Sequence, residues 1–432
     1  MLAMLAVLAG LPVSTVGVAQ TQADVSGALT LAQAETTALA NQPMMLAAQL
    51  RARSSAERVH EVHAGYLPTV AFNATGVRVA DTGTSTAAGN ITTSAISDRF
   101  AYGGNLAQLV TDFGRTSALV GSARATAEAQ ANVATLTRAQ VRLNVREAYY
   151  QLLGAEAVLR AARAALDNRA LISRQLSALA QSELRSTLDV NFAKVLESEA
   201  ELAVVRAESV VAQSRSRLAT AMGRQAPVTA ALTDVPAATD ALPPTPDGLL
   251  AQGLMLRADL DAAQSQQKAA AEFAAAEKRL NYPTLNVLGT AGQIPFHDHT
   301  LHDNYAAVGF NLNIPIFNGG AYRARQKEAE FEMCARARDV DELRLEVTEQ
   351  VRDNWYRADE AYRSLDVTER LVAQSKLALQ LAKDRYDAGL GSIVELNEAQ
   401  LNETSAEITA ADATYSYLIR RAELDFAAGL LN

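Results

Sequence analysis

Apolar residues recur at heptad spacing in two long stretches of the chain that contain no proline. The first stretch lies between Pro68 and Pro227, and the second follows Pro315. Because a heptad seam places its apolar residues on one face of a helix, both stretches predict long helices packed side by side as coiled coils. The first helix, expected from about Gly114 to Leu179, is on the order of 100 Å long at ~1.5 Å per residue. The seams are Val145, Ala148, Leu152, Ala155, Leu159, Ala162 and Leu166, then Leu365, Val372, Leu379 and Tyr386.

Before each long helix, the period of the pattern changes from helical to two. The clearest segment is Val308 to Ile314, where apolar residues alternate with glycine and asparagine. Such alternation gives a strand one apolar and one polar face, as in membrane barrels. A less regular counterpart extends from Arg99 to Val110. The strands expected to begin at Thr69 and Thr284 pair with these two segments as hairpins.

The chain contains two copies of one unit. Val145 and Tyr150 recur as Val351 and Tyr356, at a step of 206 residues (351 − 145). Pro68 recurs as Pro283, at a step of 215. The first copy is therefore nine residues longer (215 − 206) before Asp112, and the Thr-, Ser- and Gly-rich interval 82–93 predicts that the extra length is an exposed loop.

These patterns divide the chain into four segments. An apolar run ending in small residues predicts a signal peptide at 1–19; since it lacks Lys and Arg, we expect the natural start to lie upstream of Met1. Repeat 1 covers 28–224, with strands at about 67–80 and 97–111. A proline-rich linker covers 225–246, and repeat 2 covers 247–432, with strands at about 283–293 and 304–316. No stretch after residue 20 reaches ~18 uninterrupted apolar residues, so helical membrane spans are not expected.

Four membrane strands are too few to form a closed barrel. Membrane barrels need about eight or more strands, because an open edge leaves backbone polar groups unpaired in lipid. Several chains must therefore share one barrel. Three chains supply twelve strands with threefold symmetry, and two chains, with eight strands, remain possible.

Composition supports a mainly α-helical protein with a small β part. Aromatic residues make up 5% of the chain, and Ala, Leu, Gln, Glu and Arg recur throughout. Cys334 is the only cysteine, which excludes an internal disulfide and a cysteine-based zinc cluster. The net charge of −9 argues against nucleic-acid binding. No serine, histidine and carboxylate set or phosphate-binding loop emerges, so the sequence does not indicate an enzyme.

Three motifs resemble the TolC-like outer-membrane efflux protein family over nearly the whole chain, from about Leu29 to Leu431. The first is the strand entry ending in Pro68, which recurs at Pro283. The second is the strand exit 314–320, Ile-Pro-Ile-Phe-Asn-Gly-Gly, and the third is the run 386–392, Tyr-Asp-Ala-Gly-Leu-Gly-Ser, leading to Glu395. Each motif is weak alone, but their duplicated spacing makes the resemblance specific.

The resemblance implies a homotrimeric channel-tunnel in the bacterial outer membrane, with a shared twelve-stranded barrel and a long periplasmic α-barrel that ends in a closable tip. It also implies partners, namely a periplasmic adaptor and an inner-membrane pump of the resistance-nodulation-division or ATP-driven type. The function implied is passive exit of substrates in multidrug efflux or type I secretion, without a cofactor. The surrounding outer-membrane lipid is a further expected contact.

The resemblance places the periplasmic tip at two helical turns. The turn residues are Gly389, Gly391 and Ser392 in the second copy and Ser186 in the first. Glu395 and Glu398 lie three residues apart on the following helix, so both face one side. In a trimer they would form two carboxylate rings that favour cations; a solvated acidic helix start, favoured by the helix dipole, is the alternative.

The first copy departs from this tip pattern. It keeps one acid, Asp189, and has Phe192 at the position of Glu398. Ala180 and Glu183 replace Tyr386 and Gly389, so we expect a differently shaped turn, with a different adaptor contact.

Histidines suggest one further function. His297, His299 and His302 share a short loop with two aspartates and are weak candidates for a metal site. Solvated loop residues are the simpler interpretation, and we expect no metal. Two other functions therefore remain open: a metal-specific efflux duct, and a periplasmic coiled-coil spacer or adhesin without a pore. The spacer has no reason to keep the alternation of Val308 to Ile314.

Overall fold

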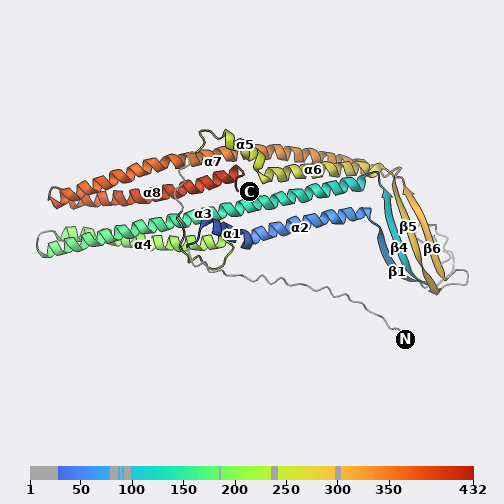
Figure 1. Cartoon of the computed structure of the whole chain (residues 1–432), viewed down its shortest axis with the longest axis horizontal. Coiled ribbons are helices and arrows are strands. Elements are labelled where there is room, and N and C mark those ends of the chain that lie inside the picture. Colours follow the sequence, from blue (N-terminus) through green and yellow to red (C-terminus); the bar gives the residue numbers. More distant parts are fainter. Residues whose placement is uncertain are drawn as a thin grey trace, which may run out of the picture.

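The fold is taken from a computed structural model, which describes residues 28–77, 86–87, 90–91, 99–183, 186–234, 242–296 and 303–432. Figure 1 shows an elongated molecule with a β-sheet at one end and two helical hairpin turns at the other. Three sequence predictions lie outside the described residues: the signal peptide 1–19, most of the loop 82–93, and the trio His297, His299 and His302.

The sheet has four antiparallel strands in the order β1-β4-β5-β6, and β1 and β6 form its two edges (Figure 1). The expected hairpins are the pairs β1 with β4 and β5 with β6; the pairing of β4 with β5 joins the two repeats. A short pair, β2 (Thr86–Ala87) and β3 (Asn90–Ile91), lies between β1 and β4 in the sequence. The four strands are β1 (Thr69–Val77), β4 (Arg99–Thr111), β5 (Thr284–Phe296) and β6 (Asn304–Asn313).

The helices repeat with the two steps found in the sequence. In the first copy they are α2 (Pro43–His63), α3 (Arg115–Gln181) and α4 (Thr187–Ala221). In the second they are α6 (Ala258–Lys278), α7 (Ala321–Asp387) and α8 (Ile393–Ala427). The bounds of α6 follow those of α2 by 215 residues, and the bounds of α7 and α8 follow those of α3 and α4 by 206. The 3-10 turns η1 (Ala64–Tyr66) and η2 (Arg279–Asn281) also differ by 215.

The long helices form one layer that extends from the sheet (Figure 1). Near the sheet α3 packs between α2 and α6, and α6 packs against α7. Toward the tip α3 packs between α4 and α8, and α8 packs against α7. The helix α3 therefore joins the two repeats along its whole length, while α2, α4 and α7 form the outer margins of the layer.

A tight left-handed turn connects each long helix to its strand. Gly114 (φ +90°) and Gly320 (φ +84°) directly precede α3 and α7, and glycine adopts this conformation without a Cβ clash. The residue before each of these glycines is also in the left-handed conformation, with φ +56° at Phe113 and φ +65° at Gly319. Asp112 stabilises the first turn, because its carboxylate accepts hydrogen bonds from the backbone N–H groups of Gly114 and Thr116 at 3.1 and 2.6 Å.

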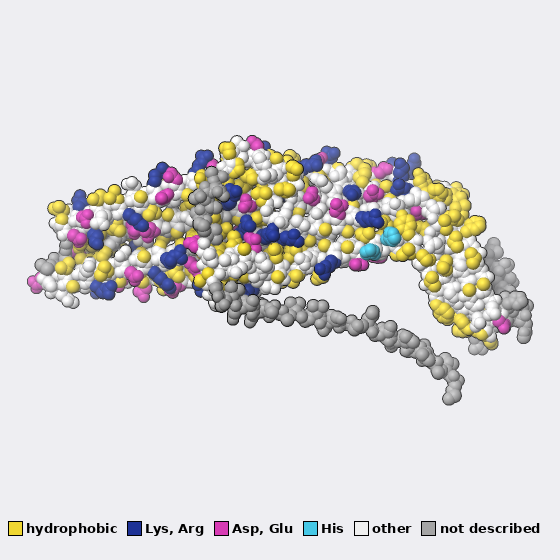
Figure 2. Space-filling view, in the orientation of Figure 1, with side chains coloured by type: hydrophobic (Ala, Val, Ile, Leu, Met, Phe, Trp, Pro, Cys, Tyr) yellow, Lys and Arg dark blue, Asp and Glu magenta, His cyan; other side chains and the backbone are white. Residues whose placement is uncertain are grey.

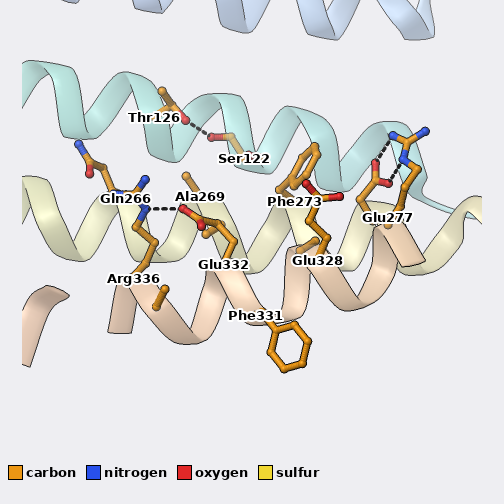
Figure 3. A pocket seen from close by; sticks show the side chains of 14 residues that line it. Ser122, Thr126, Gln266, Ala269, Phe273, Glu277, Glu328, Phe331, Glu332 and Arg336 are labelled. Carbon is orange, nitrogen blue, oxygen red and sulfur yellow. Dashed lines mark hydrogen bonds and ion pairs between the residues drawn. The ribbon is translucent and has the colours of Figure 1, made fainter. Parts of the chain in front are cut away.

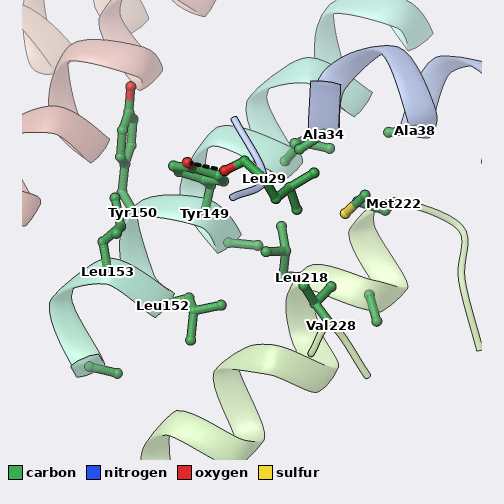
Figure 4. Packing of buried hydrophobic residues seen from close by; sticks show 14 of the residues in the cluster. Leu29, Ala34, Ala38, Tyr149, Tyr150, Leu152, Leu153, Leu218, Met222 and Val228 are labelled. Atoms are coloured by element: carbon green, nitrogen blue, oxygen red, sulfur yellow. Dashed lines mark hydrogen bonds between the residues drawn. The ribbon is translucent and has the colours of Figure 1, made fainter. Parts of the chain in front are cut away.

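Buried aromatics attach the middle of the helical layer to the flanking segments, which include α1 (Leu31–Asn41) and α5 (Asp247–Leu256). The Tyr149 hydroxyl lies 2.8 Å from the Leu29 carbonyl and 2.7 Å from the Thr233 carbonyl, inside an apolar cluster (Figure 4). Burial raises the pKa of Tyr149 to about 12. Trp355, its counterpart in the second repeat, donates from Nε1 to the Pro243 carbonyl at 3.1 Å. Both aromatics thus hold the linker region onto the helices.

The surface changes character between the two ends of the molecule. In Figure 2 hydrophobic side chains cover much of the sheet, whereas Lys, Arg, Asp and Glu are scattered along the helices. Within the described residues, no helix combines the length and the hydropathy that crossing a membrane requires.

The strand register separates a polar face of the sheet from an apolar one. Asn105 lies opposite Thr290 on the polar face, and the Thr290 hydroxyl donates to Asn105 Oδ1 at 2.8 Å. Two residues before Asn105, Gly103 lies opposite Gly292, and the Tyr305 hydroxyl lies close to both glycines. The apolar face carries exposed residues from the strands β1, β4 and β6: Val70, Phe72, Phe100, Leu106, Val308, Phe310 and Leu312.

Candidate functional site at the helical tip

The predicted tip residues lie at two hairpin turns at the end of the molecule far from the sheet (Figure 1). Ser392 caps α8, its hydroxyl accepting a hydrogen bond from the Glu395 N–H at 3.1 Å. Ser186 caps α4 in the same way, accepting from the Leu188 N–H at 3.1 Å. The serines therefore fix where each returning helix starts, which places Glu395 and Asp189 in the first turn of α8 and α4.

The two turns share a left-handed residue, although their sequences differ. Gly389 has φ +73°, and Glu183, at the equivalent position, has φ +59°. Each donates its N–H to the carbonyl three residues earlier, Gly389 to Tyr386 at 3.0 Å and Glu183 to Ala180 at 3.1 Å. The different shape expected for the first turn is therefore not found at this residue. Because a glutamate pays a steric cost in this conformation, the first turn holds local strain.

An arginine that the sequence analysis did not single out lies beside Glu395. Arg385 Nε is 3.4 Å from Glu395 Oε1, and another guanidinium nitrogen donates to the Leu390 carbonyl at 3.4 Å. Arg385 thus links the last turn of α7 to both the loop and the first turn of α8. Its counterpart in the first repeat is Leu179, so a comparison of the two copies offers a signal that would have found it.

Glu398 is exposed and Asp189 is partly buried, and neither forms an ion pair within the described part of the chain. Large apolar side chains are exposed around them: Leu390, Val394, Leu188 and Phe192. The tip of one chain therefore presents acidic groups among apolar ones.

A small apolar core holds the two tip hairpins together. Tyr386, Ile393 and Leu396 from the second hairpin pack with Leu176 of α3 and Ala193 of α4. Any separation of the hairpins exposes this cluster to water, at a free-energy cost that grows with the apolar area uncovered.

Further from the tip, three charged groups meet between α7 and α8. Lys376 Nζ lies 2.7 Å from Glu407 Oε1. The pKa of Glu403 is raised, mainly by burial and then by the negative charge of Glu407. The Glu403 carboxyl therefore loses its proton less readily in the folded protein than it would in water.

A groove of about 1020 Å³ lies between α3, α6 and α7, away from the tip (Figure 3). Glu277 lies at its edge, and its buried carboxylate contacts the Arg325 guanidinium at 2.9 and 2.8 Å. Phe273 and Phe331 also line the groove. Within the described residues, no three His, Cys, Asp or Glu side chains lie close enough to hold a metal. The histidine trio predicted as a weak metal candidate is outside those residues.

Comparison with protein families gives one match that covers most of the chain. The family model described as "Outer membrane efflux protein" matches residues 36–224 and 249–430, that is, both repeats.

Individual relatives are distant. Outer membrane protein TolC of Escherichia coli (strain K12) is 24% identical over 152 residues, 35% of this chain and 30% of that protein. The alkaline protease secretion protein AprF of Pseudomonas aeruginosa is 26% identical over 137 residues, 31% of this chain and 28% of that protein. The chain thus matches less than a third of the length of these relatives. Among solved structures, the outer-membrane channel OprN has the same fold, with a TM-score of 0.79, 23% identity, and coverage of 92% of this chain and 89% of that one.

Proposed function

Because the chain belongs to the outer membrane efflux protein family, we propose that it is the outer-membrane duct of a tripartite efflux or type I secretion system. It is an outer-membrane protein, and the members of its family are channel proteins rather than enzymes. The proposal is that substrates leave passively through it, while an inner-membrane pump supplies the energy and a periplasmic adaptor joins the two.

The sheet is the observation that carries this proposal. It has one apolar face, one polar face and two edges, β1 and β6, that pair with only one strand each within the described residues. Unpaired edges in lipid leave backbone groups without hydrogen bonds. Three chains joined edge to edge give twelve strands and a pore lined by the polar face. A coiled-coil spacer without a pore gives no reason for such a sheet.

The tip supplies the proposed gate. In a trimer, Glu395 and Glu398 would each occur three times around the axis, with Asp189 on the neighbouring hairpins. Carboxylate rings of this kind favour cations over anions. Since Arg385 already pairs with Glu395 in one chain, Glu398 is the acid whose charge is less compensated.

Planar-bilayer recording of the purified protein tests both parts of the proposal. We expect conductance steps with a cation preference, and a weaker preference in the Glu395→Gln, Glu398→Gln double variant. Glu330→Gln, an exposed acid on α7 far from the tip, is the matched control and should leave the preference unchanged. Absence of channel steps in the wild type and in the double variant would overturn the proposal.

A further inference from the structure

The internal duplication makes one junction inside the chain a template for the junction between chains. Strands β4 and β5 join repeat 1 to repeat 2. The two edge strands, which pair on one side only among the described residues, are their counterparts, since β6 corresponds to β4 and β1 corresponds to β5. If a second copy of the chain lies against the first, β6 in repeat 2 of one chain meets β1 in repeat 1 of the other, so the same two repeats are joined again. This inference rests on the proposed function, because it assumes that several copies share one barrel.

The alignment of the two copies is well fixed near the sheet. The strands β1 and β5 begin at Thr69 and Thr284, 215 residues apart, as do the helices and 3-10 turns before them. The left-handed residues after β4 and after the β6 segment, Gly114 and Gly320, are 206 residues apart. Each residue of β4 therefore has its counterpart 206 positions later, in or just after β6, and each residue of β5 has its counterpart 215 positions earlier, in or just after β1.

Transfer of the β4–β5 register gives a specific pairing between chains. Asn105 and Thr290 lie opposite each other and are joined by a side-chain hydrogen bond. Their counterparts are Asn311 (105 + 206) and Thr75 (290 − 215), which are the same two residue types. We propose that β6 of one subunit pairs antiparallel with β1 of the next, in the register that places Asn311 of the partner subunit opposite Thr75 and joins them by the same hydrogen bond.

The exposed residues of both edges agree with this register. It pairs Asn311 and Thr75 on the polar face, and Phe310 of the partner subunit with Gly76 on the apolar face. Phe310 is 76% exposed in the single chain, and Gly76, which already has the Phe100 ring of β4 beside it, carries no side chain of its own on that face. A shift by one residue would instead place polar side chains of one strand beside apolar ones of the other.

The register also accounts for the apolar segment after β6. Thr111 pairs with Leu285 at the end of the β4–β5 ladder. The equivalent pair joins Phe317 of the partner subunit to Val70. In the single chain β6 ends at Asn313, and Ile316 and Phe317 are 94% and 88% exposed. Pairing with the next subunit extends β6 to Phe317, the counterpart of Thr111, at which β4 ends.

The helices next to the sheet provide a second, independent contact. Where α3 meets α6, a Cβ added to Gly121 would lie 3.1 Å from the Glu272 carboxylate. Transfer of this contact brings Lys327 of the partner subunit (121 + 206) against Glu57 (272 − 215). Both side chains are exposed, and neither forms an ion pair within the described part of its own chain. The chemistry that fits is an intersubunit ion pair between α7 and α2.

The lining of the groove between α3 and α6 extends this complementarity. Ser122 and Gln266, both neutral, line it from opposite sides. Their counterparts at the junction between subunits are Arg51 and Glu328 of the partner subunit, which carry opposite charges; Glu328 also lines the groove of its own chain. The surface that each chain leaves open thus fits a second copy of itself in charge as well as in register.

Cysteine cross-linking in membranes tests the strand register. In a Cys334→Ser background, which removes the native thiol, the pair Thr75→Cys with Asn311→Cys is compared with two controls. These combine Thr75→Cys with Gly309→Cys or with Asn313→Cys, two residues away on the same face. Directly opposed Cβ atoms lie ~5 Å apart and diagonal ones ~7–8 Å, so we expect cross-linking on the order of tenfold faster in the first pair.

The outcomes separate this inference from the proposed function. Covalent dimers and trimers formed fastest by the 75 and 311 pair support the register. The register alone is overturned if the protein still runs as a trimer on native gels but a control pair cross-links as fast or faster. The same conclusion follows if the trimer forms and no pair cross-links. A monomer on native gels in all variants and in the wild type overturns the shared barrel as well.

Charge reversal tests the helical contact without requiring a reactive thiol. Glu57→Lys and Lys327→Glu should each lower the temperature at which the trimer dissociates in detergent, because each places like charges together. The double variant should regain the wild-type temperature. If the double variant is as unstable as the sum of the two single variants, the two side chains do not meet.

Discussion

Removal of the Arg325 side chain should strongly destabilise the helices next to the sheet. The Glu277 side chain is 3% exposed and depends on Arg325, at 2.9 and 2.8 Å, for compensation of its charge. At the equivalent positions the first repeat has Val62 and Leu119, both partly buried apolar residues. Arg325→Leu therefore leaves a buried carboxylate without its cation, whereas Glu277→Val with Arg325→Leu copies the arrangement of the first repeat.

The expected magnitude follows from the burial of the two partners. Breaking a buried pair by removal of one partner costs roughly 3–5 kcal/mol of the free energy of unfolding. Because the Arg325 side chain is 50% exposed, water reaches the remaining carboxylate, and the lower end, about 3 kcal/mol, applies. The double variant removes both charges, so it should lie close to the wild type or above it, as buried ion pairs replaced by apolar residues often do.

Hydrogen–deuterium exchange measures this locally, without the need for reversible unfolding of the whole protein. A loss of about 3 kcal/mol corresponds to exchange faster by roughly 150-fold in peptides of α6 in the Arg325→Leu variant. The same peptides should be protected again in the double variant. Wild-type exchange in the single variant, or still faster exchange in the double variant, would refute the view that the pair compensates a buried charge.

Three further changes test other parts of the account. Glu183→Gly should slow exchange of the α3–α4 turn about fivefold, since relief of a left-handed glutamate is worth ~1 kcal/mol; Glu183→Ala, which keeps the Cβ, should give no such gain. Gly292→Ala should prevent formation of the heat-modifiable barrel on SDS gels, because its Cβ would meet the Tyr102 carbonyl, whereas Gly104→Ala, with open space around its Cβ, should not. Burial raises the pKa of Glu403, so the contribution of this group to stability is greatest at a pH below the ordinary carboxyl pKa and is lost as pH rises through the raised pKa. After correction for the pH dependence of the intrinsic exchange rate, α8 should exchange more slowly at acidic pH. Glu403→Gln should remove that difference.

Features that depend on local pattern could be predicted from the sequence. The heptad seam from Val145 gave one long helix, expected at 114–179 and observed at Arg115–Gln181. The alternation from Val308 gave the strand β6, and the mainly α-helical class and the family resemblance are confirmed. These succeed because helical and strand periods are written directly in the order of apolar residues.

Features that join distant parts of the chain could not be predicted in this way. The pairing of β4 with β5, the contact of Arg385 with Glu395, and the burial of Glu277 all depend on which faces meet after folding. Glu183 shows that prediction can also fail for a local feature. A glutamate in place of Gly389 suggested a turn of different shape, yet the backbone at Glu183 has the same left-handed conformation as Gly389. The roles of Glu395, Glu398 and Asp189 in gating stay predictions.

Native mass spectrometry of the detergent-purified protein tests the central claim most directly, because it counts the chains that make up one membrane particle. We predict three chains in each particle, rich in both helix and sheet by circular dichroism. A single chain that stays in solution without detergent would contradict it.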